Sequence, residues 1–188
     1  MWPWEHIAFG YLCYSLSVNL MRRTSPGTKE VFVLGFATLL PDLVDKPLSW
    51  SFELFPAGYS IAHSIFVASV LLAITTVLAW WRHCLRYAAA FGVGYASHLI
   101  GDIVYPVVMG EGLKPEVVLW PVVQLPAYEQ HHGLVGRFLL YFFQYLHMLD
   151  EAGWHPLVVF EVVLLFVVFV LWLSDGMPGL PTPNWREQ

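Results

Sequence analysis

The chain has 188 residues, of which 57% are hydrophobic and only 12% are charged, and its mean hydropathy is +0.59. A soluble domain of this length does not need so much apolar surface, so the composition favours a membrane protein that crosses the bilayer several times. The net charge of −5 includes no basic cluster of the kind that binds nucleic acid, and the two cysteines form no C-x-x-C pair, which argues against a thiolate metal site.

Five segments have the length and apolar character of transmembrane helices, since a helical span needs about 20 mostly apolar residues. In chain order they cover residues 4–21, 30–48, 62–81, 87–109 and 155–174. The sequence therefore predicts an all-α fold, a polytopic transmembrane helix bundle of about five spans. We expect one transmembrane helical domain over residues 1–176, followed by a short proline-rich tail over residues 177–188.

The region 110–150 interrupts this series of spans. Residues 112–128 are apolar but contain three prolines, which leave helical stretches too short to cross a bilayer. Residues 138–149 are also short, so we predict an interfacial or re-entrant segment over residues 110–150. A sixth span at residues 138–149 is the alternative, and it would move the C-terminus to the other side of the membrane.

Basic residues predict the orientation of the bundle. They fill the loop between the first and second segments and the loop between the third and fourth: Arg22, Arg23, Lys29, Arg82 and Arg86. By the positive-inside rule, both loops face the cytoplasm. We therefore expect a multi-pass protein of the plasma or inner membrane, with the N-terminus and residues 110–153 on the extracytoplasmic side.

Side chains of the metal-ligand type fall at one level of this predicted bundle, near its extracytoplasmic end. They are His6 in the first segment, Asp42 and Asp45 in the second, His63 at the start of the third, and His98 and Asp102 in the fourth. His98 and Asp102 are four residues apart, so both lie on the same face of a helix. Ionisable groups inside a membrane are costly and are functional candidates by default.

Imidazoles and carboxylates without thiolates suit a divalent metal ion, zinc above all, with manganese also compatible. We predict that one ion is bound by His6, Asp42, His63, His98 and Asp102. An ion of this kind activates water for hydrolysis, and one of Asp42, Asp45 or Asp102 would serve as general base instead of ligand. We assign catalytic roles to Asp45 and Asp102. Asp45 could instead orient a histidine, and His98 with Asp102 could be a polar pair that only links helices.

Five motifs occur in an order that resembles the YdjM-like family of inner-membrane metal-dependent hydrolases. They are "EHIAFG", "LLPDLVDKPL", "IAHSIF", "SHLIGDIVYP" and "VLWPV", and they cover roughly residues 5–125. The resemblance implies metal-dependent hydrolase activity and carries the family's motif residues onto His6, Asp42 with Asp45, His63, and His98 with Asp102.

Two motifs depart from the family. "PDLVDK" has an extra residue, and "AGYSIAHS" lacks the histidine, arginine and threonine of H-R-x-x-T-H-S, so no basic group is expected there to hold an anionic substrate.

The H-x-x-x-D spacing also looks loosely like the zinc site of bacterial phospholipase C. That likeness implies a phosphoester substrate, and a site in the membrane implies a lipid or lipid-linked one. The sequence thus favours a membrane-embedded hydrolase whose site lies under a lid-like segment, residues 110–135.

The alternative is a non-enzymatic metal-binding carrier or stress-linked scaffold. A carrier needs polar groups in both halves of the membrane, and the inner halves of the first, third and fourth segments look nearly uncharged.

Overall fold

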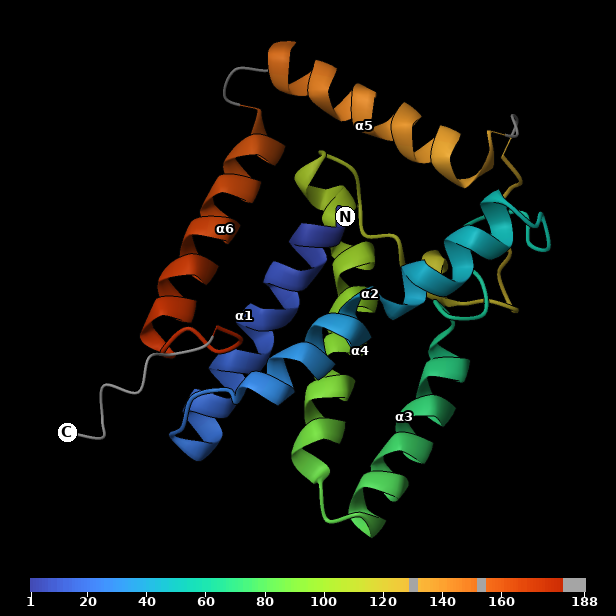
Figure 1. Ribbon diagram of the computed structural model, residues 1–188. Coiled ribbons are helices and arrows are strands. Elements are labelled where there is room, and N and C mark those ends of the chain that lie inside the picture. The colour runs from blue at the N-terminus through green and yellow to red at the C-terminus, as the bar shows by residue number, and fades with distance from the viewer. Residues whose placement is uncertain (129–131, 152–154, 181–188) are drawn as a thin grey trace.

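Figure 1 shows the computed structural model, which describes residues 1–128, 132–151 and 155–180. These residues form six α-helices and one 3-10 turn and contain no strand, which confirms the all-α prediction. The helices are α1 (Pro3–Arg22), α2 (Thr28–Trp50), α3 (Ile65–Trp81), α4 (Leu85–Val108), α5 (Gly133–Glu151) and α6 (Pro156–Ser174), and the 3-10 turn is η1 (Pro115–Val118). Most of the predicted tail, from residue 181 onward, lies outside the described residues.

The helices differ in how closely they match a membrane span. Among the described residues, α6 is the one helix that is both long enough and apolar enough to cross a bilayer, and the apolar helix α3 has only 17 residues. The helices α1, α2 and α4 have 20, 23 and 24 residues, but buried charged and histidine side chains interrupt their apolar surface. By length alone, several of these helices could cross a membrane. By length and hydropathy together, only α6 qualifies among the described residues.

The centre of the bundle is the close contact of α2 with α4 and α1 around Thr38. Thr38 is fully buried, and its hydroxyl donates a hydrogen bond to the carbonyl oxygen of Leu34 at 2.7 Å. A Cβ atom at Gly94 would lie 2.6 Å from that carbonyl oxygen, and one at Gly10 would lie 2.7 Å from the Thr38 hydroxyl. Small residues thus allow three helix backbones to approach closely, as is common in membrane bundles.

Two carboxylates, one buried and one partly buried, attach α6 to the rest of the bundle. The buried one, Glu161, accepts hydrogen bonds from Trp4 Nε1 at 2.6 Å and from the Tyr145 hydroxyl at 2.5 Å. At the other end of α6, Asp175 accepts hydrogen bonds from side chains of α1, namely Tyr11, Ser15 and Asn19. An apolar helix with few polar groups of its own is thereby fixed in position beside α1.

Helix α3 begins three residues later than predicted, and His63 consequently lies in the turn that precedes it. The Ser64 side chain accepts a hydrogen bond from the backbone N–H of Val67 at 3.4 Å and so caps the helix. Serine favours this capping position because its oxygen satisfies one of the free N–H groups of the first turn. His63 is thus held by an irregular segment rather than by a helix.

Helix α5 is longer than the short apolar stretch suggests, and it lies across the end of the bundle near the N-terminus (Figure 1). The guanidinium carbon of Arg137 lies 3.8 Å from the centroid of the Tyr128 ring, which ties the first turns of α5 to the preceding segment. Residues 115–120 fold back into the bundle, where Val117 and Val118 are buried and the Ser64 hydroxyl donates to the carbonyl oxygen of Trp120 at 2.6 Å.

The contact of α4 with α2 yields a first prediction. We expect Gly94→Ala to destabilise the protein by about 1–3 kcal/mol, because the added methyl group meets a backbone carbonyl that cannot move aside without displacing α2. The measurement is thermal unfolding of the purified protein in detergent. The matched control is Gly92→Ala in the same helix, where the nearest atom to the added Cβ is 3.9 Å away. Equal melting temperatures for the two variants would contradict the prediction.

Candidate metal centre

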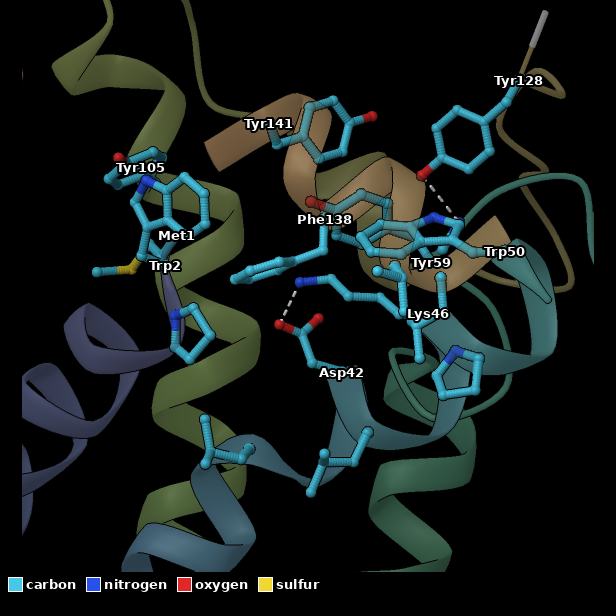
Figure 2. A pocket seen from close by; sticks show the side chains of 17 residues that line it. Met1, Trp2, Asp42, Lys46, Trp50, Tyr59, Tyr105, Tyr128, Phe138 and Tyr141 are labelled. Atoms are coloured by element: carbon cyan, nitrogen blue, oxygen red, sulfur yellow. Dashed lines mark hydrogen bonds and ion pairs between the residues drawn. The ribbon is translucent and has the colours of Figure 1, made fainter. Parts of the chain in front are cut away.

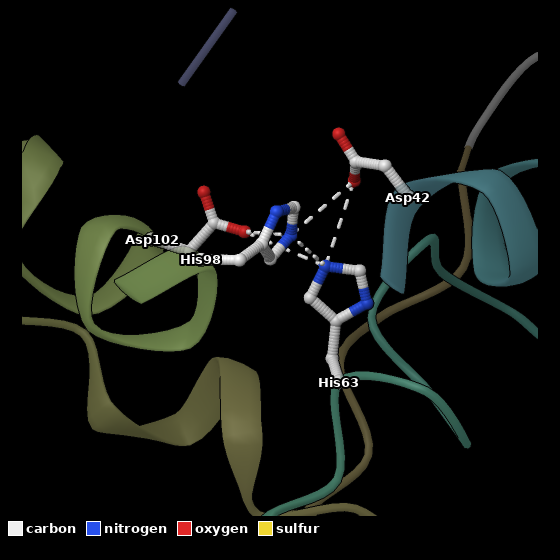
Figure 3. A group of neighbouring side chains, drawn as sticks. All are labelled: Asp42, His63, His98 and Asp102. Carbon is white, nitrogen blue, oxygen red and sulfur yellow. Dashed lines mark hydrogen bonds and ion pairs between the residues drawn. The ribbon is translucent and has the colours of Figure 1, made fainter. Parts of the chain in front are cut away.

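Four buried side chains from three parts of the chain point at one another (Figure 3). Asp42 comes from α2, His63 from the turn before α3, and His98 and Asp102 from successive turns of α4. One donor atom of each residue lies within 4.8 Å of the donor atom of every other. We call these four residues the donor cluster.

Distances within the donor cluster fit a single small cation. His63 Nε2 lies 3.4 Å from Asp102 Oδ2 and 3.5 Å from Asp42 Oδ1. His98 Nε2 lies 3.4 Å from Asp102 Oδ2, 3.8 Å from Asp42 Oδ1 and 3.0 Å from His63 Nε2. Donor atoms about 2.1 Å from a tetrahedrally bound zinc ion are separated from one another by about 3.4 Å. The observed separations are close to that value.

Asp45 lies on the far side of the His63 ring from the donor cluster. Its carboxylate accepts backbone N–H groups of Ser60, Ala62 and His63 at 2.8–3.1 Å, and it is 2.8 Å from His63 Nδ1. A carboxylate can only accept here, so His63 carries its proton on Nδ1 and turns the lone pair of Nε2 towards the cluster. This geometry favours an orienting role for Asp45 over proton transfer to a substrate.

The second histidine of the cluster is oriented in the same way by the backbone of α2. His98 Nδ1 lies 2.7 Å from the carbonyl oxygen of Thr38, which has no proton to donate, so Nδ1 is the donor. Thr38 lies in the helical turn before Pro41, a residue that has no N–H and whose ring crowds the preceding turn. As with His63, the Nε2 lone pair of His98 is left for the donor cluster.

His6 stands beside the donor cluster, next to the other oxygen of Asp102. Its ring stacks on His98 at a centroid distance of 3.8 Å, and its Nε2 lies 3.3 Å from Asp102 Oδ1. Neither ring nitrogen of His6 has a hydrogen-bond partner among the described residues, although only 1% of the side chain is exposed. The Met1 amino group lies 3.2 Å from the same carboxylate oxygen.

Buried nitrogens without a hydrogen-bond partner are rare, and the Nε2 of His6 would gain a partner in a cation bound beside Asp102. The structure thus brings all five predicted ligands together, with four of them around a common point and His6 at its edge. The donor set fits a divalent ion, because both cluster histidines direct Nε2 and both carboxylates direct an oxygen into the cluster. The residues that would hold such an ion are Asp42, His63, His98 and Asp102.

Lys46 is the basic residue beside the cluster that sequence reasoning missed. Its ammonium group forms an ion pair with Asp42 Oδ2, the carboxylate oxygen that faces away from His63. The spacing in the sequence predicts this ion pair, because Lys46 follows Asp42 by four residues and therefore lies on the same helix face. Its direct neighbour in the sequence, Asp45, is engaged with His63 instead.

Comparison with known proteins gives one result. The family described as YdjM inner membrane protein matches residues 1–176. No curated protein and no solved structure matches the chain significantly. The matched range includes every residue of the donor cluster, together with His6, Asp45 and all six helices.

The position of Asp45 leads to a second prediction. We expect Asp45→Asn to lower zinc affinity about 10–100-fold, because an amide no longer fixes the His63 tautomer and ring orientation. Chelator competition with purified protein would measure this affinity. Asp175→Asn is the matched control, since Asp175 accepts three side-chain hydrogen bonds far along α1 from the cluster. Wild-type zinc affinity in Asp45→Asn would show that the orientation of His63 is set by other contacts.

Proposed function

The chain belongs to the YdjM family of inner membrane proteins, and from this premise we propose that it is a membrane-embedded, metal-dependent hydrolase. Its proposed substrate is a phosphoester in a lipid or lipid-linked molecule. The observation that carries the proposal is the donor cluster, in which two oriented imidazoles and two carboxylates are buried around one point. Nitrogen and oxygen donors without thiolate favour zinc, and manganese is compatible.

A bound ion of this type lowers the pKa of its water ligand to about 7 and polarises a phosphoryl oxygen. The chain's own residues would divide the remaining work. Asp102 directs Oδ2 into the donor cluster and Oδ1 towards His6, so Oδ1 is the atom we assign to take up a proton. We assign Asp45 to holding His63 in place.

The proposal includes an arrangement in the membrane. Helices α1, α2, α3, α4 and α6 would cross the bilayer, with the arginine-bearing loops in the cytoplasm. Helix α5 would lie in the extracytoplasmic interface above the donor cluster. This is supported by its orientation across the end of the bundle in Figure 1 and by its polar and apolar faces, which are the most clearly separated of the six helices.

A metal-binding carrier is the competing function, and one observation favours it. Asp175, at the end of α6 and outside the three segments whose inner halves the sequence shows as nearly uncharged, forms a second polar group with its partners on α1 at the opposite end. Between this group and the donor cluster, however, Gly10, Thr38 and Gly94 pack so closely that an added methyl group would overlap its neighbours. A closed centre of this kind argues against an ion pathway and for a site that opens on one side.

The third prediction separates an enzyme from a structural polar pair. We expect His98→Ala and Asp102→Asn to lose bound metal and to reduce phosphoester turnover by about 100-fold or more, because both remove a ligand and the second also removes the proposed base. The measurements are metal per chain and turnover of a phospholipid, with His83→Ala as the histidine control outside the cluster. The hydrolase proposal fails if both variants keep wild-type metal content and turnover and differ only in melting temperature.

The fourth prediction concerns orientation. In a chain with Cys13 and Cys84 replaced by alanine, we expect Gly112→Cys to react with a membrane-impermeant maleimide on intact cells. Thr24→Cys should react only after lysis, because it lies in the arginine-bearing loop between α1 and α2. Both positions are exposed, so burial does not complicate the comparison. The reverse labelling pattern would place the donor cluster at the cytoplasmic end.

A further inference from the structure

A cavity of about 730 Å³ lies directly beside the donor cluster, with Asp42 in its wall (Figure 2). Pockets that hold small organic ligands have volumes of about 300–1,000 Å³. The residues that line it are mostly apolar or aromatic and include Trp2, Leu43, Trp50, Tyr105, Phe138 and Tyr141. The roof is formed by α5, which begins near the end of the segment 110–135 that the sequence suggests as a lid.

Lys46 places a positive charge where this cavity meets the donor cluster. Its ammonium group pairs with Asp42 Oδ2, while Oδ1 of the same carboxylate lies 3.5 Å from His63 Nε2. The ammonium nitrogen also lies 5.6 Å from the centroid of the Trp50 ring, and the side chain is 25% exposed. An ammonium group has three N–H donors, and the contact with Asp42 uses one of them.

We propose that this cavity binds an anionic amphiphile with a phosphate headgroup, which rests on the proposed function and deepens it by naming the cavity and the basic residue that hold the substrate. The phosphate would lie between Lys46 and the donor cluster, where the ammonium donates to its oxygens as a point charge. The apolar chain would lie along the aromatic lining under α5. Lys46 is thus a substrate-binding residue, supplied by α2, that replaces the basic group absent from "AGYSIAHS".

An apolar cavity alone would accept any hydrophobic molecule, and Lys46 alone would accept any anion. Their adjacency selects a molecule that has both parts, with the charged part at the donor cluster. Inorganic phosphate has the charged part but no apolar chain, and a neutral alcohol has the apolar chain but no charge. Each of them therefore satisfies only half of the site. The binding of these two compounds relative to that of an alkylphosphonate therefore tests the proposal directly.

The experiment is equilibrium binding of a long-chain alkylphosphonate, which contains no phosphoester to hydrolyse, to the purified full chain in detergent. We expect wild type to bind it more tightly than inorganic phosphate or the equivalent alcohol. Lys46→Met should weaken phosphonate binding by about tenfold or more and leave alcohol binding unchanged, since a charge-assisted hydrogen bond is lost. Unchanged alcohol binding in Lys46→Met shows that the cavity of this variant is folded, and Lys46→Arg should retain most of the phosphonate binding because it keeps the positive charge.

Matched controls come from the same structure. Lys114 also pairs with a carboxylate, Glu111, but on the surface, so Lys114→Met should bind like wild type. Phe138→Ser in the cavity lining should weaken binding of both phosphonate and alcohol, whereas Phe143→Ser on an exposed part of α5 should not. Unchanged phosphonate binding in Lys46→Met, or equal wild-type affinity for phosphonate and inorganic phosphate, would overturn the proposal.

This outcome is separable from that of the hydrolase proposal. If wild type binds the phosphonate through Lys46 and Phe138 but turns over no phosphoester, the substrate class stands and the hydrolase fails. If wild type cleaves a phospholipid and Lys46→Met does so with unchanged KM and kcat, the hydrolase stands and the role of Lys46 fails. A raised KM with little change in kcat is the kinetic result expected of a residue that binds substrate.

Discussion

Thr38 couples the packing of the bundle to the geometry of its polar site. Its side chain fills the narrow space between Gly10 and Gly94, so it sets how closely α2 approaches α1 and α4. Its carbonyl oxygen holds the Nδ1 proton of His98 and thereby turns Nε2 towards Asp42 and Asp102. Because one residue does both, a shift of α2 against α4 alters helix packing and donor spacing together.

Neither of the two helices that carry residues of the donor cluster is apolar enough to be a clear membrane span. Asp42 interrupts the apolar surface of α2, and His98 with Asp102 interrupts that of α4, whereas α6 has no residue in the cluster and remains the most apolar helix. Ionisable groups are expensive in hydrocarbon and persist where they serve a purpose. The ionisable residues of the donor cluster thus account in part for the weak span character of α2 and α4.

The sequence predicts the site better than its surroundings. Spacing along a helix brings His98 and Asp102 to one face, and charge bias brings the other candidates to the same level, so the cluster is predictable from local rules. Local rules do not specify how each helix is rotated about its axis. For that reason the position of Asp45 behind His63 and the length of α5 emerge only from tertiary contacts, whereas the pairing of Lys46 with Asp42 follows from their four-residue spacing within α2.

The order of these elements along the chain has a consequence for how the protein is made. Asp102 is the last residue of the donor cluster, whereas α5, which forms the roof of the cavity, starts at Gly133. Chains generally fold from the N-terminus as synthesis proceeds. The four donor residues are therefore synthesised before the roof, which leaves an interval in which an ion can reach the nascent site without passing α5. A metal ion bound at the donor cluster and a substrate bound in the finished cavity would then have two different routes into the protein.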